Sequence, residues 1–155
     1  MSQQELLARV IKVLRTGNLP YMITGSIASS LQGEPRSTHD IGIVVSAQKS
    51  SIHHFREAFP SPDFHLDESA MAEAIETNGM FNLINVQEGD KIDFWMLTDD
   101  AFDSSRFARR ITEQFKGIDV QVSAPEDTIL AKLKWAKELK VGELWKRLLE
   151  EAEQS

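Results

Sequence analysis

Residues 21–45 carry the most informative pattern of the chain: Tyr21-Met22-Ile23-Thr24-Gly25-Ser26 and, after a polar loop, Thr38-His39-Asp40-Ile41-Gly42-Ile43-Val44-Val45. The first run predicts a short apolar strand that leads directly into Gly-Ser, and residues 27–31 then predict a short helix. A helix N-terminus presents unpaired N–H groups and the positive end of the helix dipole, which suits phosphate. Gly25 lets the backbone approach a ligand, and Ser26 adds a hydroxyl donor. A plain helix cap is the more common role of such a pair.

The second run predicts a strand over residues 38–45. Alternation along it puts Asp40 and Gly42 on one face and the isoleucines on the other. Two carboxylates at this spacing would bind a pair of Mg²⁺ ions across a triphosphate. The second position is glycine here, so only one of the two carboxylates is present. A solvated residue at the start of a strand is the alternative interpretation of Asp40.

Asp93 is a lone carboxylate in the apolar run Lys91-Ile92-Asp93-Phe94-Trp95. It is in phase with Lys91 and Trp95 on the strand that this run predicts. Burying a charge there is costly unless the charge meets a cation or a metal ion. Asp93 is therefore a second candidate metal ligand, and an exposed strand face is the alternative.

The remaining patterns predict one domain over residues 1–155, with a helical segment over 124–155. We expect an α/β (α+β) fold with a mixed central sheet and flanking helices. The predicted helices cover residues 2–16, 48–59, 68–77, 102–115 and 125–139. Ser2 and Glu5 have capping-box spacing at the first of them, and Asp67 is the expected cap of the third. The further strands cover 80–86, 91–97 and 118–122, and the first two are expected to form a hairpin about residues 87–90.

The composition limits the classes of function. The chain has no cysteine, which excludes disulfides and thiolate metal sites, and 17 basic against 24 acidic residues give a net charge of −7. Such a balance disfavours broad, non-specific nucleic-acid binding, whereas a nucleotide carried with Mg²⁺ is easier to accommodate. No apolar run approaches the roughly 18 residues of a membrane span, and no basic leader precedes the first apolar residues. We therefore expect a cytoplasmic protein with no membrane partner.

The order of these motifs resembles the nucleotidyltransferase fold of the polymerase-beta superfamily. The resemblance is closer to a group of small prokaryotic nucleotidyltransferase-like proteins similar to abortive-infection and type IV toxin nucleotidyltransferases. It covers about residues 1–137 and includes the runs 21–38, 81–84 and 124–133. Gly42 departs from the pattern, because the family has an aspartate at that position.

The resemblance implies a role for each candidate residue. Gly25 and Ser26 would hold the triphosphate, Asp40 would bind metal, and Asp93 would bind metal or act as the base. Lys132 belongs to an Asp-x4-Lys element beginning at Asp127 and would lie near the phosphates, as would Arg36 before the second strand. A solvated lysine and a plain loop cation are the alternatives for Lys132 and Arg36. The implied cofactor is Mg²⁺ or Mn²⁺, and an NTP is the implied substrate.

Two functions are consistent with this sequence. The first is an enzyme that transfers a nucleoside monophosphate from NTP·Mg²⁺ to a hydroxyl of a protein, an RNA or a small molecule. The second is a catalytically degenerate domain that acts as a nucleotide-binding or protein-interaction module, for example with a partner of the antitoxin type. Gly42 separates the two, because it removes one of three expected acids.

Overall fold

A computed structural model of the chain describes residues 2–24, 40–138 and 149–153. The chain divides into two compact units, Met1–Ser123 and Ala124–Ser155. Each unit is considered by itself below. No helix in the described ranges combines the length and the apolar character that crossing a bilayer requires.

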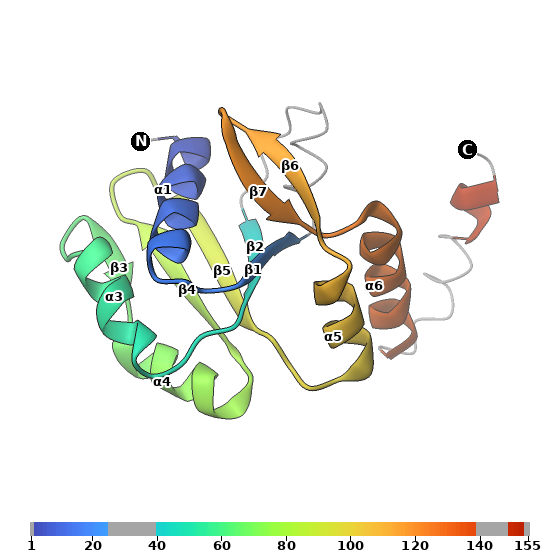
Figure 1. Ribbon diagram of the computed structural model, residues 1–155, viewed down its shortest axis with the longest axis horizontal. Coiled ribbons are helices and arrows are strands. Elements are labelled where there is room, and N and C mark those ends of the chain that lie inside the picture. The colour runs from blue at the N-terminus through green and yellow to red at the C-terminus, as the bar shows by residue number, and fades with distance from the viewer. Residues whose placement is uncertain (1, 25–39, 139–148, 154–155) are drawn as a thin grey trace. The chain divides into compact units, whose positions relative to one another are not determined.

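The first unit is built on a seven-stranded mixed sheet (Figure 1) with the order β3-β4-β5-β2-β1-β7-β6. Its two central strands, β2 and β5, run parallel, as do β1 and β7, and all other pairs are antiparallel. The strands are β1 Tyr21–Thr24, β2 Asp40–Val45, β3 Phe64–Leu66, β4 Met80–Asn85, β5 Lys91–Met96, β6 Ile111–Phe115 and β7 Ile118–Val122. This mixed sheet confirms the predicted fold class.

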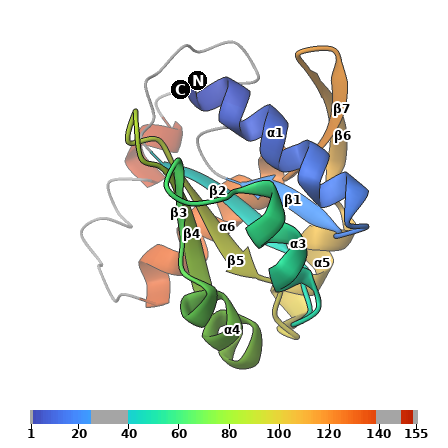
Figure 2. The same cartoon turned by 90° about the vertical axis from the view of Figure 1, so that its left-hand side faces the viewer.

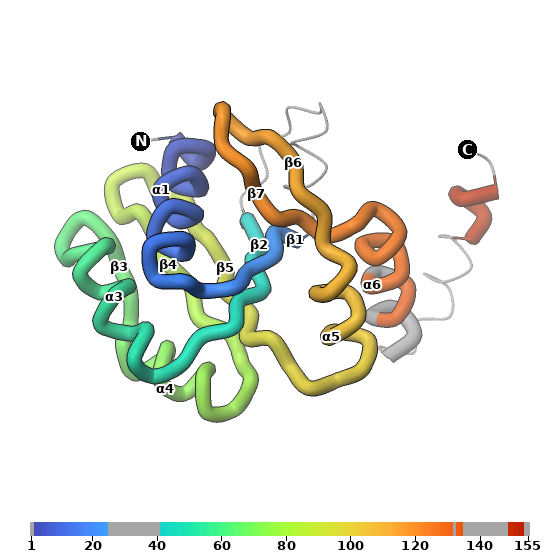
Figure 3. The backbone as a smooth tube through the Cα atoms, viewed as in Figure 1, coloured from blue at the N-terminus to red at the C-terminus, as the bar shows by residue number. Residues whose placement is uncertain are grey.

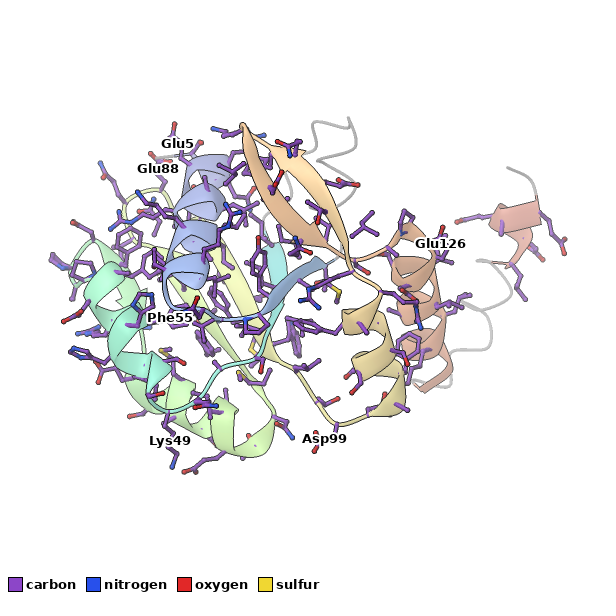
Figure 4. All side chains as sticks on the ribbon, in the orientation of Figure 1. Glu5, Lys49, Phe55, Glu88, Asp99 and Glu126 are labelled. Carbon is purple, nitrogen blue, oxygen red and sulfur yellow. The ribbon has the colours of Figure 1, made fainter. Side chains whose placement is uncertain are left out.

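Three helices cover one face of this sheet, namely α1 (Gln3–Thr16), α3 (Ser51–Ala58) and α4 (Glu68–Thr77). Their apolar residues pack on the inward positions of the strands, and the resulting core contains Leu7, Ile11, Ile43 and Phe94, all fully buried. Phe55 points from α3 into this core (Figure 4), edge-on to the rings of Phe81 and Phe94. The isoleucine face of the second predicted strand is therefore the core face.

The other face of the sheet is covered in part by α5 (Ala101–Ala108). Phe107 of α5 packs against Met22 of β1 and Val44 of β2, with Leu97 beside them. This small cluster leaves the neighbouring polar positions of the same face outside the apolar packing.

Capping residues determine where two of the helices begin. Ser2 and Glu5 form the reciprocal capping box of α1, and Asp67 accepts hydrogen bonds from the N–H groups of Ser69 and Ala70 at the start of α4. Both caps satisfy N–H groups that a helix start leaves unpaired. The sequence predicted both.

The predicted helix over 102–115 is wrong in its second half. The helix ends at Ala108, and residues 111–115 form β6, which pairs with β7 around the turn Lys116-Gly117. Both turn residues have positive φ, 49° and 81°, as the type I′ turn of a two-residue hairpin requires. Figure 3 shows the chain passing from β6 through the turn into β7. Strand β3 was not predicted at all.

The second unit contains α6 (Pro125–Glu138), which begins at Pro125 as predicted. Its Asp127 is buried, and residues 149–153 are helical. The predicted helix over 27–31 lies outside the described residues. The single-domain prediction stays a prediction.

Candidate functional site

Four residues form one row across the second face of the sheet, the face on which α5 packs. Strand register pairs Thr24 of β1 with Gly42 of β2, Gly42 with Asp93 of β5, and Asp93 with Asn82 of β4. Directly paired residues share a face of a sheet. These four residues are named the polar row; all of them are partly exposed.

Asp93 is the charged member of the polar row. Its side chain is only 15% exposed, and its Oδ1 lies 3.6 Å from Nζ of Lys91, two positions earlier on β5. A carboxylate this far out of water needs a cationic neighbour, and Lys91 supplies one. An ammonium group thus provides the cation next to Asp93, and the predicted role of Asp93 as a metal ligand or base stays a prediction.

Gly42 lies between Thr24 and Asp93, and little space lies above it. A Cβ added to Gly42 would come within 2.7 Å of Oγ1 of Thr24 and 4.0 Å of Nε1 of Trp95. The position that the family pattern gives to an aspartate is thus bordered by a hydroxyl and an indole N–H. Both can donate hydrogen bonds, and neither replaces a carboxylate as a ligand for a divalent cation.

The row next to the polar row is aromatic and apolar. Val44 pairs with Trp95, and Trp95 pairs with Met80. Trp95 is 49% exposed although it belongs to an inner strand of the sheet. A flat indole surface is therefore accessible beside the polar row.

Asp40 is located here by its backbone. It begins β2 and pairs with Lys91, so it is diagonal to Asp93 on the neighbouring strand. Strand spacing and rise place the two Cα atoms about 8 Å apart. The register brings the two predicted acids to adjacent strands, and their joint binding of a cation stays a prediction.

The other predicted site residues are Gly25, Ser26, Arg36 and Lys132. Gly25, Ser26 and Arg36 lie outside the described residues. Gly25 directly follows Thr24 of the polar row in the sequence, and Asp40 is the first residue described after Thr24. Lys132 lies on α6 of the second unit, and its predicted phosphate contact stays a prediction.

A metal site in this unit would depend on Asp40 and Asp93. Among the described side chains, no three Asp, Glu or His residues come together in a way that could hold an ion. Gly42 leaves two predicted acids, Asp40 and Asp93, and two carboxylates fit a single hydrated cation better than a bridged pair. The residues present are thus compatible with one divalent ion.

Thr24 and Asn82 belong to the polar row and were not predicted as site residues. The predicted strands 80–86 and 91–97 put Asn82 and Asp93 on the same face, but the turn predicted between them places Ile84 opposite Asp93. In the structure Ile84 pairs with Lys91, and this register brings Asn82 opposite Asp93. Thr24 had no local signal, because the order of β1 and β2 in the sheet depends on tertiary pairing.

Comparisons with known proteins agree with this architecture. No family model matches the chain, and no curated relative does. Among solved structures, TM1012 of Thermotoga maritima, a proposed nucleotidyltransferase, superposes with a TM-score of 0.58 at 19% identity, over 94% of this chain and 92% of that one. The antibiotic-resistance factor ANT(2'')-Ia gives 0.57 at 17% identity, over 88% and 72% of the two chains. The lincosamide antibiotic adenylyltransferase LnuA, in its lincomycin-bound structure, gives 0.55 at 15% identity, over 80% and 82%.

The chain therefore has a nucleotidyltransferase-like fold. At identities below 20% the likeness establishes the fold, whereas function depends on the site itself.

Proposed function

We propose that the chain transfers a nucleoside monophosphate from an NTP to a hydroxyl group and releases pyrophosphate. The observation that supports this most strongly is Asp93, a carboxylate held in the polar row beside Lys91 and opposite Gly42. The triphosphate would lie at Gly25 and Ser26, with Arg36 and Lys132 as further phosphate contacts.

In this proposal each residue has a defined task. Asp93 accepts the proton of the acceptor hydroxyl, whose oxygen then attacks the α-phosphorus of the NTP. The bond from the α-phosphorus to the bridging oxygen breaks, and pyrophosphate leaves with the electron pair. Lys91, 3.6 Å from Asp93, favours the ionised carboxylate before transfer. Alignment of the two reactants supplies much of the rate enhancement.

Asp40 and Asp93 would hold a divalent cation, Mg²⁺ or Mn²⁺. Such an ion neutralises phosphate charge and polarises the reacting phosphoryl group. Water and phosphate oxygens would complete its coordination, because protein oxygens alone are too few.

A second candidate function is nucleotide binding without transfer, and Gly42 favours it. The missing carboxylate is the one that the family pattern places opposite Asp93, and the hydroxyl of Thr24 borders the vacant position. A domain of this kind would serve as a binding or interaction module, with an antitoxin-type protein as one class of partner.

Pyrophosphate release separates the two functions. Each of the four NTPs is incubated with the protein and Mg²⁺, alone and with RNA, polyhydroxylated small molecules or protein as acceptor. Transfer predicts pyrophosphate release that falls about a hundredfold or more in Asp93→Asn. The matched control is Asp63→Asn, an exposed carboxylate in the turn before β3. Nucleotide binding with no pyrophosphate from any combination would favour the second function.

A further inference from the structure

A hollow of about 1010 Å³ lies between α1, the end of α3 and the β6–β7 turn. Figures 1 and 2 show α1 running beside the β6–β7 hairpin. Four cationic residues line the hollow, namely Arg9, Lys12, Arg15 and Lys116. This concentration of positive charge contrasts with the net charge of −7 of the chain.

Three of these four cationic side chains make no hydrogen bond or ion pair to the described part of the chain that would stabilise the fold. Arg9 donates to the carbonyl of Ala58 at 2.8 Å and stacks on the ring of Phe64. Lys12, Arg15 and Lys116 are exposed, and their side chains have no hydrogen-bond or ion-pair partner within the described residues. The acid among the described lining residues, Glu57, lies 2.9 Å from Nε2 of His53. The hollow therefore has an unbalanced positive charge.

The floor of the hollow is aliphatic. It is formed by Ile11 and Val13 of α1, Ala58 of α3 and Ile118 of β7. None of the described lining residues is aromatic, so bases of a nucleic acid would find no ring to stack on. An aliphatic floor with a cationic rim is instead complementary to an acidic segment that also carries aliphatic side chains.

The shape favours a helical segment. The α1 residues that line the hollow extend from Ala8 to Thr16, about 12 Å along the helix axis. Arg9, Lys12 and Arg15 follow one another at intervals of three residues, so they lie along one side of α1. Acids three or four residues apart on a partner helix would match this spacing.

We propose that this basic hollow binds an acidic amphipathic helix of a partner protein. The helices α1 and α3 pack on the sheet face opposite the polar row. The partner would thus be bound on the side of the sheet away from the nucleotide site, and the proposal does not depend on the proposed function.

A designed peptide tests the proposal. A fluorescent helical peptide of about 20 residues, with leucine on one face and glutamate elsewhere, is long enough to be helical when bound. We expect saturable binding by fluorescence anisotropy that weakens with salt. It should weaken at least about tenfold in the double variant Lys12→Glu/Arg15→Glu, and also in Lys116→Glu. A peptide with lysine in place of glutamate should bind the double variant better than it binds the native chain.

The control is Lys49→Glu, which changes the net charge of the chain by the same amount as Lys116→Glu. Lys49 lies just before α3, at the end of that helix away from the hollow (Figure 4). Lys49→Glu should therefore leave the affinity for the peptide unchanged. Thermal unfolding checks that every variant is folded. Three results would each overturn the proposal. The first is equal affinity for a peptide with glutamine in place of glutamate, and the second is an equal loss of peptide affinity in Lys49→Glu and Lys116→Glu. The third is tighter binding of a single-stranded RNA oligonucleotide than of the peptide, with the RNA binding abolished by Lys116→Glu.

Discussion

At the scale of single residues, Gly42 decides how many acids the site contains. An aspartate there would restore the family pattern, but its Cβ would lie 2.7 Å from Oγ1 of Thr24. Thr24 would have to turn its hydroxyl away or the strands would have to shift. Gly42→Asp would thus lower the stability of the fold and at the same time add a carboxylate ligand for metal.

We predict that Gly42→Asp tightens Mg²⁺-dependent NTP binding and lowers stability without metal. Overpacking of this kind costs about 1–3 kcal/mol, and the new carboxylate lies near Asp93 on the paired strand. Calorimetric titration and thermal unfolding, with and without Mg²⁺, measure the two effects.

Two companion variants separate the causes. Gly42→Ala adds the Cβ without the charge, and it should lower the melting temperature without tightening NTP binding. Thr24→Ala/Gly42→Asp removes the hydroxyl that obstructs the new side chain, so it should regain stability relative to Gly42→Asp. If Gly42→Asp left both affinity and stability unchanged, position 42 would not face the site.

Tyr21 provides a second prediction at this scale. Burial raises the pKa of its phenol above the ordinary value of 10.0, and the N–H of Gln121, which donates to the phenol oxygen at 3.2 Å, opposes the rise in part. The folded state therefore keeps the proton at a pH where the unfolded chain has lost it. The stability that Tyr21 contributes is complete below pH 10 and declines as the pH rises from there through the higher folded pKa.

Tyr21 is the single tyrosine of the chain, so ultraviolet absorbance reports its ionisation directly. We expect a titration midpoint above 10.0 in the folded protein and a return to about 10 in denaturant. Tyr21→Phe should reduce the loss of stability above pH 10. A folded midpoint at or below that of the denatured chain would contradict the buried position.

At the scale of elements, α4 depends on the cap at Asp67. Its Oδ1 accepts from the N–H of Ser69 at 2.9 Å and of Ala70 at 3.2 Å. We predict that Asp67→Ala lowers the free energy of unfolding by about 1 kcal/mol. Asp67→Asn is the matched control, because asparagine caps as well as aspartate, and chemical denaturation measures both. Equal losses in the two variants would show that the carboxylate charge stabilises α4 and the cap bonds do not.

Elements also show where local sequence patterns were sufficient. The caps at Ser2 and Asp67 and the β4–β5 hairpin depend on neighbouring residues, and the sequence predicted them correctly. Strand β6 was predicted as helix, and Phe107, Ile111 and Phe115, each four residues apart, do fit a helical apolar spacing. Its strand conformation depends on pairing with β7 around Lys116-Gly117, and this two-residue turn is a local signal that the prediction of a helix passed over. The short strand β3 is similarly defined by its partner β4.

At the scale of the whole molecule, the site depends on the order of the strands in the sheet, which cannot be read from sequence patterns alone. Asp40 and Asp93 could be selected as isolated carboxylates in apolar strands, but their neighbours could not. The opposition of Gly42 to both Thr24 and Asp93 follows from the strand order β5-β2-β1. Likewise, Lys116 lines the basic hollow together with Arg9, Lys12 and Arg15, although it lies about 100 residues away from them in the sequence.

The proposed function requires that the polar row around Asp93 binds a nucleoside triphosphate together with a divalent cation. Calorimetric titration of each NTP into the native chain and into Asp93→Asn, with and without Mg²⁺, tests it most directly. We predict binding of at least one NTP that is tighter with Mg²⁺, and loss of that Mg²⁺ enhancement in Asp93→Asn but not in Asp63→Asn. Absence of binding by every NTP, or an Mg²⁺ enhancement that Asp93→Asn leaves intact, would contradict the proposed function.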